Sequence, residues 1–333
     1  MNFEPVEAVL TLPRLWVQNA NAVSSPLTWG FPPPSAFAGF VHALQRRLQQ
    51  EGHALQLEGV GIICHDFEPQ TFRPPGHYHQ VFRLTRNPLN EKGETAAIVE
   101  DGRAHLSVSL VIGVTGDYPA GDHKRTEFAK MAMTLASGMR LAGGSVLPHP
   151  SQQAGRVFEP ELLEWPADPE GQAHAFHRLR RQLLPGFALV GRDALLAAHR
   201  QQLSAQRQQP VTALDALLDL CRLNVEPHHQ ENGDTLWQVR RAQRGWLVPL
   251  PVGYAAISLL YQPGEAQGVR DRSVPFRFVE SLLSLGEWVS PHRITSLQQL
   301  FWHHQAQPEQ GLYRLLNHYL PNNRIESLTQ GVA

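Results

Sequence analysis

The stretch Arg140-Leu141-Ala142-Gly143-Gly144-Ser145-Val146-Leu147-Pro148 lies where two predicted elements meet. An amphipathic helix, expected from about residue 122 to 139, ends there and an extended segment begins. Two adjacent glycines can adopt positive φ and let another backbone approach closely, and successive N–H groups in such a turn suit phosphate oxygens. Arg140 adds a charged guanidinium group, which can donate two parallel hydrogen bonds, and Ser145 adds a rotatable hydroxyl. The same glycines would also serve as an ordinary helix C-cap.

Working outward from this stretch, the first half of the chain alternates between strand and helix patterns. The order is β-α-β-β-α-β, the split βαβ arrangement of ferredoxin-like domains. We therefore predict an α+β fold with a ferredoxin-like core in residues 1–160 and a hairpin insertion around residues 68–103. The expected strands are residues 8–18, 55–67, 106–114 and 145–147, and the expected helices are residues 35–50 and 122–139.

Residues 161–333 are predicted to form a mixed helical and hairpin region that packs on the core and on partner subunits. One hairpin is expected to pair residues 237–240 with residues 245–250. The expected helices are residues 173–184, 193–208, 212–223, 275–285 and 296–304.

Composition excludes several classes of protein. With 333 residues, 42% hydrophobic and 18% charged, the sequence is typical of a globular protein, and its net charge of −1 provides no global basic field for nucleic acid. The two cysteines lie far apart, so a disulfide framework or a cysteine zinc site is not expected. The sequence shows no signal-peptide pattern and no apolar run long enough to span a membrane, so we expect a cytoplasmic protein without a membrane partner.

The chemistry-bearing residues favour binding over catalysis. Histidines occur in close pairs without a third ligand at metal-site spacing, so neither a metal nor a cofactor is expected. Arginines recur in predicted loops and strand ends, where they can form a discontinuous phosphate-binding set. A histidine among arginines can instead cleave RNA by activating a 2′-hydroxyl, and His42 and His149 are the two candidates for that alternative.

Five blocks of sequence, in order, resemble a known family over nearly the whole chain. They are residues 19–44, Leu84-Thr-Arg-Asn-Pro-Leu-Asn90, Met139-Arg-Leu-Ala-Gly-Gly-Ser145, Leu183-Leu-Pro-Gly-Phe-Ala-Leu189 and Leu285-Gly-Glu-Trp-Val-Ser-Pro-His-Arg293. Together they resemble the second Csy subunit of type I-F CRISPR surveillance complexes, in the Cas-five class of RAMP proteins.

The resemblance implies a noncatalytic subunit with a ferredoxin-like RAMP core and a protruding hairpin or thumb. Such subunits hold the 5′ handle of the CRISPR RNA (crRNA), pair with the large subunit at the tail of the complex and abut a backbone subunit; proximity to target DNA is left open. The alternative is a metal-independent RAMP endoribonuclease that processes precursor crRNA. Together with the loop arginines, the resemblance gives as predicted RNA-binding residues Asn19, Asn21, Ser24, Ser25, Trp29, Arg86, Arg103, Arg140, Gly143, Gly144, Ser145, Arg270, Arg272 and Arg277.

Overall fold

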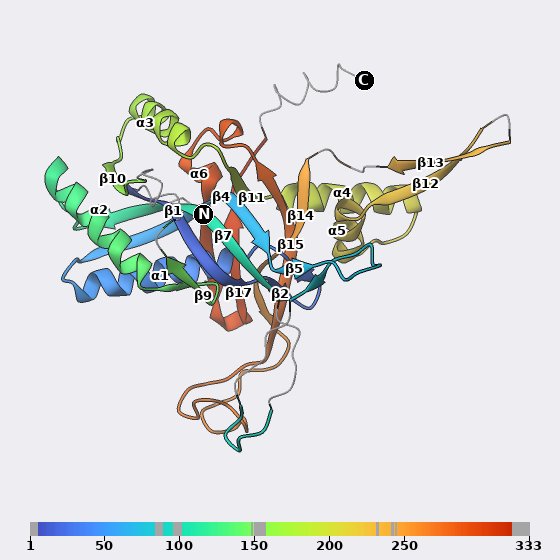
Figure 1. Ribbon diagram of the computed structural model, residues 1–333, viewed down its shortest axis with the longest axis horizontal. Helices are drawn as coiled ribbons and strands as arrows, with labels where there is room; N and C mark the ends of the chain where they lie inside the picture. The colour runs from blue at the N-terminus through green and yellow to red at the C-terminus, as the bar shows by residue number, and fades with distance from the viewer. Residues whose placement is uncertain are drawn as a thin grey trace.

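The computed structural model describes most of the chain, and its described part is an α+β fold, as predicted (Figure 1). The described residues are 6–83, 89–95, 102–147, 149, 158–230, 233–240, 243 and 245–321.

The first half contains three long strands and one short strand of a mainly antiparallel sheet, together with two helices. In chain order they are β1 (Ala8–Asn21), α1 (Pro34–Gln50), β4 (Leu55–Pro69), β7 (Arg103–Gly116), α2 (Asp122–Ser137) and β9 (Gly144–Leu147). In space the strands lie in the order β9–β1–β7–β4, and each neighbouring pair is antiparallel. The predicted positions of these elements are confirmed to within a few residues.

Strand alternation explains how this sheet is covered. Leu10 and Leu12 of β1 belong to the main hydrophobic core, together with Phe37 of α1 and Phe128 of α2. Val9 belongs to a second core, together with Phe176 and Leu179 of α3 (Pro169–Gln182). Because successive strand residues point to opposite faces, α1 and α2 cover one face of the sheet and α3 covers part of the other.

Six short strands border the sheet or form small hairpins. β8 pairs with β9, β10 pairs with β1, β2 pairs with β3, and β5 pairs with β6. They are β2 (Val23–Ser25), β3 (Thr28–Trp29), β5 (Thr71–Phe72), β6 (Val81–Phe82), β8 (Arg140–Leu141) and β10 (Glu161–Glu164).

The second half adds further strands, and five of them join β4 in a closed ring. In the ring, β4 pairs with β11, β11 with β15, β15 with β14, β14 with β17, β17 with β16 and β16 again with β4. The elements are β11 (Phe187–Gly191), α4 (Asp193–Arg207), α5 (Ala213–Cys221), β12 (Asn224–His229), β13 (Thr235–Arg240), β14 (Trp246–Ala256), β15 (Val279–Val289), α6 (Leu297–Leu300), β16 (Phe301–Gln307) and β17 (Leu312–Asn317). The predicted boundary at residue 160 stays a prediction.

Three predictions for the second half are wrong. Residues 237–240 pair with β12, not with residues 245–250, which pair with β15 instead. Residues 279–285 of the expected helix 275–285 are strand β15. Of the expected helix 296–304, α6 forms one turn and the rest is β16. Long-range pairing overrode the local pattern at each position, because these segments complete a sheet formed by distant parts of the chain.

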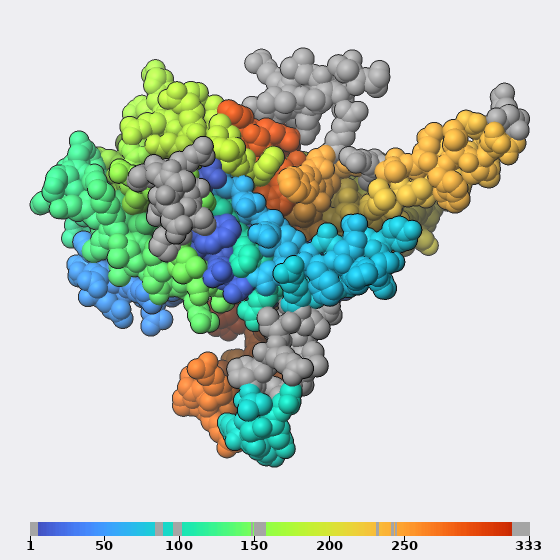
Figure 2. Space-filling model, viewed as in Figure 1, coloured from blue at the N-terminus to red at the C-terminus, as the bar shows by residue number. Residues whose placement is uncertain are grey.

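Two parts of the second half project from the body of the molecule. The β12–β13 hairpin extends outward on one side, and the loop that joins β14 to β15 extends outward on another (Figures 1 and 2). The hairpin is anchored at its base by Asp219 of α5, which accepts hydrogen bonds from His199 (2.9 Å) and Arg240 (3.0 Å). Among the described helices, none is both long and apolar enough to cross a membrane.

Candidate nucleic-acid interface

The glycine stretch forms a tight hairpin at the edge of the sheet. β8 and β9 pair Arg140 with Ser145 and Leu141 with Gly144. Ala142 and Gly143 form the turn with φ of 49° and 77°, the left-handed values that a two-residue hairpin turn requires. The positive-φ pair is therefore Ala142 and Gly143, not the two glycines. Helix α2 has already ended, with Gly138 as its C-cap, so the glycine pair is not a helix cap.

Gly144 is required for a different reason, which is the close approach of a second backbone. A Cβ atom at this position would lie 2.7 Å from both the Ala20 nitrogen and the Gln18 oxygen of β1. β9 pairs with β1 directly beside this point, with Ser145 opposite Gln18. The sequence prediction of a close backbone approach is confirmed here.

Predicted site residues from three segments meet beside this hairpin. The Asn21 amide donates to the Ala142 carbonyl at 2.8 Å, which ties β1 to the turn. Arg103 lies opposite Asn21 in the β1–β7 register, and its guanidinium donates to the Asn19 carbonyl at 3.5 Å. We call this group the hairpin edge; it consists of Asn19, Asn21, Arg103, Arg140, Gly143, Gly144 and Ser145.

The hairpin edge presents polar side chains to solvent. Asn19, Asn21, Arg140 and Ser145 are exposed, and Arg103 is half-buried. Amide, hydroxyl and guanidinium groups supply the donors and acceptors that bind phosphates, 2′-hydroxyls and base edges. The arrangement can therefore hold a single strand of nucleic acid.

The next predicted residues follow on a small hairpin, β2–β3. The Asn21 side chain brackets Val23, accepting from its amide at 3.0 Å and donating to its carbonyl at 2.9 Å. Ser25 is hydrogen-bonded to Thr28 at 2.7 Å, and Trp29 packs edge-on against Phe82. Ser24 and Trp29 border a pocket, so the β2–β3 hairpin connects that pocket to the hairpin edge.

The remaining predicted residues do not join this group. Arg270 and Arg272 are exposed in the projecting loop between β14 and β15. Arg277 packs near the turn before β17, where its guanidinium donates to the Pro308 carbonyl at 3.2 Å. Arg86 lies outside the described residues. Sequence separation alone did not indicate that these arginines belong to different parts of the surface.

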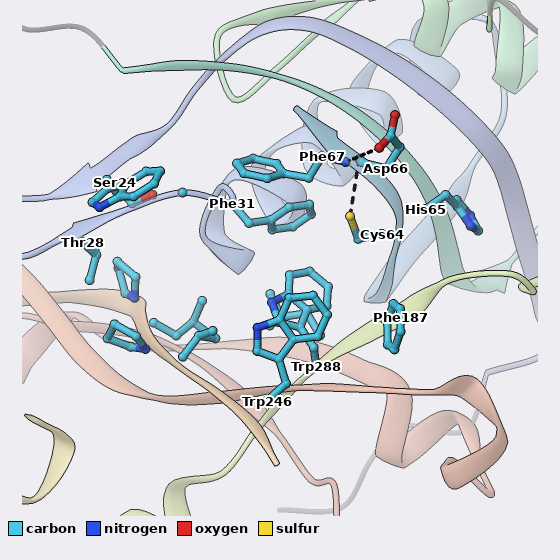
Figure 3. A pocket seen from close by; sticks show the side chains of 17 residues that line it. Ser24, Thr28, Phe31, Cys64, His65, Asp66, Phe67, Phe187, Trp246 and Trp288 are labelled. Carbon is cyan, nitrogen blue, oxygen red and sulfur yellow. Dashed lines mark hydrogen bonds between the residues drawn. The ribbon is translucent and has the colours of Figure 1, made fainter. Parts of the chain in front are cut away.

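The pocket is lined mainly by apolar side chains from both halves of the chain, six of them Phe or Trp, and has a volume of about 530 Å³. Figure 3 shows Phe31 and Phe67 on one side and Trp246 and Trp288 on the other. Asp66 of β4 lies on its wall, and its carboxylate accepts from the Phe67 amide at 3.0 Å. The sequence analysis did not bring these rings together, because they come from four separated segments.

A second polar group on the sheet was also missed. Trp16 of β1 stacks on His105 of β7 and meets the edge of His149, with ring centroids 6.0 Å apart in both pairs. His149 is hydrogen-bonded to Ser107 at 3.2 Å. Strand alternation places Trp16, His105 and Ser107 on the face opposite to α1, and this alternation was the available sequence signal.

The two candidate catalytic histidines lie on opposite sides of the sheet. His42 is exposed on α1, whereas His149 contacts Ser107 on the other face. Burial, followed by the nearby charge of Arg14, lowers the pKa of His149 and favours its neutral form. RNA cleavage by the alternative mechanism would therefore use either His42 or His149, but not both.

The described residues contain no group of three histidine, cysteine, aspartate or glutamate side chains that could hold a metal ion. The thiol of Cys64, which also lines the pocket, is unreactive at neutral pH because burial and the Asp66 charge raise its pKa to about 12.

Comparison with known proteins identifies a family and a close relative in it. The sequence model of the family described as CRISPR-associated protein (Cas_Csy2) matches residues 10–315. A protein of Pseudomonas aeruginosa (strain UCBPP-PA14), described as "CRISPR-associated protein Csy2", is 53% identical over 322 residues. That alignment covers 94% of this chain and 96% of the relative.

Proposed function

Because the chain belongs to the CRISPR-associated Csy2 family, we propose that it is a noncatalytic subunit of a type I-F RNA-guided surveillance complex. In this role it binds the 5′ handle of the crRNA, pairs with the large subunit at the tail of the complex and abuts a backbone subunit. It acts in the cytoplasm.

The hairpin edge is the observation that carries RNA binding. Exposed amide, hydroxyl and guanidinium groups from β1, β7, β8 and β9 are held together by backbone pairing, so they are in place before RNA arrives. A strand whose bases are unstacked offers phosphates, 2′-hydroxyls and base edges to such a surface. A chain of near-neutral net charge suits a subunit whose RNA contacts are confined to one edge.

The strand order supports a ferredoxin-like RAMP core. Numbered in chain order, the four strands β1, β4, β7 and β9 lie in the spatial order 4-1-3-2. One helix joins the first strand to the second and another joins the third to the fourth, which is the split βαβ connection.

The β12–β13 hairpin is our proposed contact for the large subunit. It is a two-stranded ribbon that carries exposed apolar side chains, among them Leu236, Trp237 (67% exposed) and Val239. A free two-stranded ribbon is marginally stable, and exposed apolar side chains in one place indicate a protein contact. The anchor at Asp219 holds the ribbon ready for a partner.

Substitution of the two hairpin-edge arginines tests RNA binding. In the reconstituted complex, we expect Arg103→Ala/Arg140→Ala to weaken binding of crRNA and to reduce the slope of log affinity against log salt by about 1.4, because two phosphate contacts of about 0.7 each are lost. Equilibrium binding of labelled crRNA at several salt concentrations measures both quantities.

Matched controls separate this effect from a general loss of charge. Arg46→Ala/Arg200→Ala removes two exposed arginines from helices α1 and α4 and should leave the salt slope unchanged. Equal slopes for the two double variants would contradict the proposal. Arg270 and Arg272 are proposed as a second RNA contact, on the projecting loop, and the same measurement on their alanine variants tests it.

His149 is the residue that favours the alternative function, a metal-independent endoribonuclease. Its lowered pKa leaves a neutral imidazole beside the Ser107 hydroxyl, which is the form that a general base requires. Incubation of the purified protein with labelled precursor crRNA in EDTA decides between the two functions. Cleavage that is abolished by His149→Ala would overturn the noncatalytic assignment.

A further inference from the structure

The aromatic pocket has features that neither the hydrophobic core nor the hairpin edge explains. Its walls include large rings that stay in contact with solvent: Trp246 is 58% exposed and Phe187 is 45% exposed. Exposed rings beside a cavity of about 530 Å³ provide a flat apolar surface of the size that small ligands and ligand groups occupy.

The walls are braced from behind, so the pocket is formed without a ligand. Trp246 packs against Trp288 and Phe187, with ring centroids 6.2 Å and 5.5 Å apart. Trp288 in turn meets Phe31 edge-on at 4.8 Å, and Phe31 stacks on Phe37 of the main core at 5.4 Å. A ring that enters the pocket therefore meets rigid aromatic faces and loses little free energy in ordering them.

One polar group gives the pocket a chemical preference. The hydroxyl of Ser24 is buried and has no hydrogen-bond partner among the described atoms. A buried hydroxyl without a partner is costly, and a ligand that supplies one removes that cost. The carboxylate of Asp66 points away from the aromatic rings (Figure 3) and does not contribute.

We propose that this pocket binds one unstacked nucleobase of the RNA, a site that rests on the proposed binding of the crRNA handle. The base stacks on the face of Trp246, while Ser24 bonds to its polar edge. A nucleobase combines a flat aromatic body with donors and acceptors at its rim, which matches aromatic walls that carry a hydroxyl.

The position of the pocket along the chain favours RNA over a protein side chain. Ser24 lies three residues after Asn21, and the β2–β3 hairpin that carries Ser24 and Trp29 starts where the hairpin edge ends. The Ala22 amide donates to the Gly102 carbonyl at 2.8 Å, which fixes that hairpin beside Arg103. A strand held at the hairpin edge therefore passes the mouth of the pocket.

A scan with abasic nucleotides tests the proposal in the reconstituted complex. Guide RNAs that each lack one handle base are bound to complexes containing the unmodified chain or Trp246→Ala. We expect one abasic position to weaken binding to the unmodified complex about 5- to 150-fold, the effect of losing one base–aromatic stack. Trp246→Ala should weaken binding of the intact RNA by a similar factor and abolish the sensitivity at that one position.

Tyr78→Ala is the matched control, because it removes an exposed aromatic side chain (97% exposed) that does not line the pocket. It should keep the full sensitivity of the unmodified complex to the abasic position. Ser24→Ala provides a second variant, which removes the proposed hydrogen bond to the base. It should leave assembly intact and change the preference among the four bases at the sensitive position.

Three results would overturn the proposal, and they are distinguishable. If Trp246→Ala keeps the sensitivity at every position while Arg103→Ala/Arg140→Ala still weakens binding, the handle is bound but the pocket holds no base. If Trp246→Ala releases a partner subunit and leaves RNA affinity unchanged, the pocket holds a protein side chain. If the unmodified complex binds RNA with a scrambled handle as tightly as RNA with the intact handle, the proposed function has failed as well.

Discussion

His65 of β4 makes two hydrogen bonds within the fold, and burial keeps its imidazole neutral. Its Nδ1 atom lies 2.6 Å from the Pro185 carbonyl and its Nε2 atom lies 2.6 Å from the Ser109 hydroxyl. Nδ1 donates to the carbonyl, so Nε2 accepts from the hydroxyl, and this neutral tautomer satisfies both partners. Burial, and then the nearby charge of Arg14, lower the pKa of His65 to about 4.

This shift predicts that acid destabilises the protein. In the unfolded chain the pKa of His65 is about 6.5, so between pH 6.5 and 4 the unfolded state binds more protons and the free energy of unfolding falls as the pH falls. Above pH 6.5 the contribution of neutral His65 to the free energy of unfolding is fully present. By pH 5 at most about 2 kcal/mol of it is lost. Urea unfolding at pH 7, 6 and 5 measures it.

The variant His65→Gln should be less stable at pH 7 by about 1–3 kcal/mol, because its bonds to Pro185 and Ser109 are disturbed, and its stability should depend less on pH. The exposed His79→Gln is the control and should retain the pH dependence of the unmodified chain. A His65→Gln variant with an unchanged pH profile would show that another group causes the acid effect.

At the same scale, the roles of single residues could be predicted from the sequence to different extents. Gly144 could be predicted, because only glycine tolerates a backbone as close as that of Ala20. Arg140 and Arg103 could be predicted as loop or strand-end cations, but their proximity to each other depends on the register of β1 with β7 and β9. Arg270 has the same sequence character and lies elsewhere.

Strand β15 illustrates the limits of sequence reading at the scale of an element. Residues 275–285, a mainly apolar segment with Leu282, Leu283 and Leu285, are expected to be helical from the sequence. The strand pairs with β11 on one side and β14 on the other, and residues 284–287 are all buried. A strand buried on both faces shows no alternation, so its pattern cannot be told from that of a buried helix.

The same strand carries a buried ion cluster that predicts a large stability effect. Glu287 is 2% exposed and is bonded to Arg192 and, at 3.3 Å, to Arg293. Glu287→Ala leaves Arg192 buried without its carboxylate partner, so we expect a loss of about 3–5 kcal/mol in the free energy of unfolding. Urea denaturation of the isolated chain gives this value.

Glu280→Ala is the matched control for that measurement, since Glu280 is an exposed glutamate on the same strand. Exposed substitutions of this kind change stability by less than about 0.5 kcal/mol. Similar losses for the two variants would mean that burial of the ion cluster does not stabilise β15.

At the scale of the whole molecule, β4 joins the two halves of the chain. It pairs with β7 in the first half and with β11 and β16 in the second, and the main core contains Leu10 and Phe37 alongside Leu189 and Trp302. The pairings of β4 with β11 and β16 join residues more than a hundred positions apart, so no local pattern could reveal them. The order of β1, α1, β4, β7, α2 and β9 could be predicted, because their sequence patterns are local.

The sharing of β4 predicts that residues 1–160 do not fold alone. Without β11 and β16, the backbone of β4 around Val60 and Ile63 loses its hydrogen-bond partners and becomes an open apolar edge. We expect this fragment to be insoluble or to unfold without a cooperative transition, and co-expression with residues 161–333 to restore a soluble pair. Deletion of the β12–β13 hairpin is the control, because that ribbon pairs with no strand of the main sheet and its loss should leave one cooperative thermal transition in circular dichroism. A fragment 1–160 that melts cooperatively by itself would instead show that the first half is an independent domain and that the ring of strands assembles on a finished core.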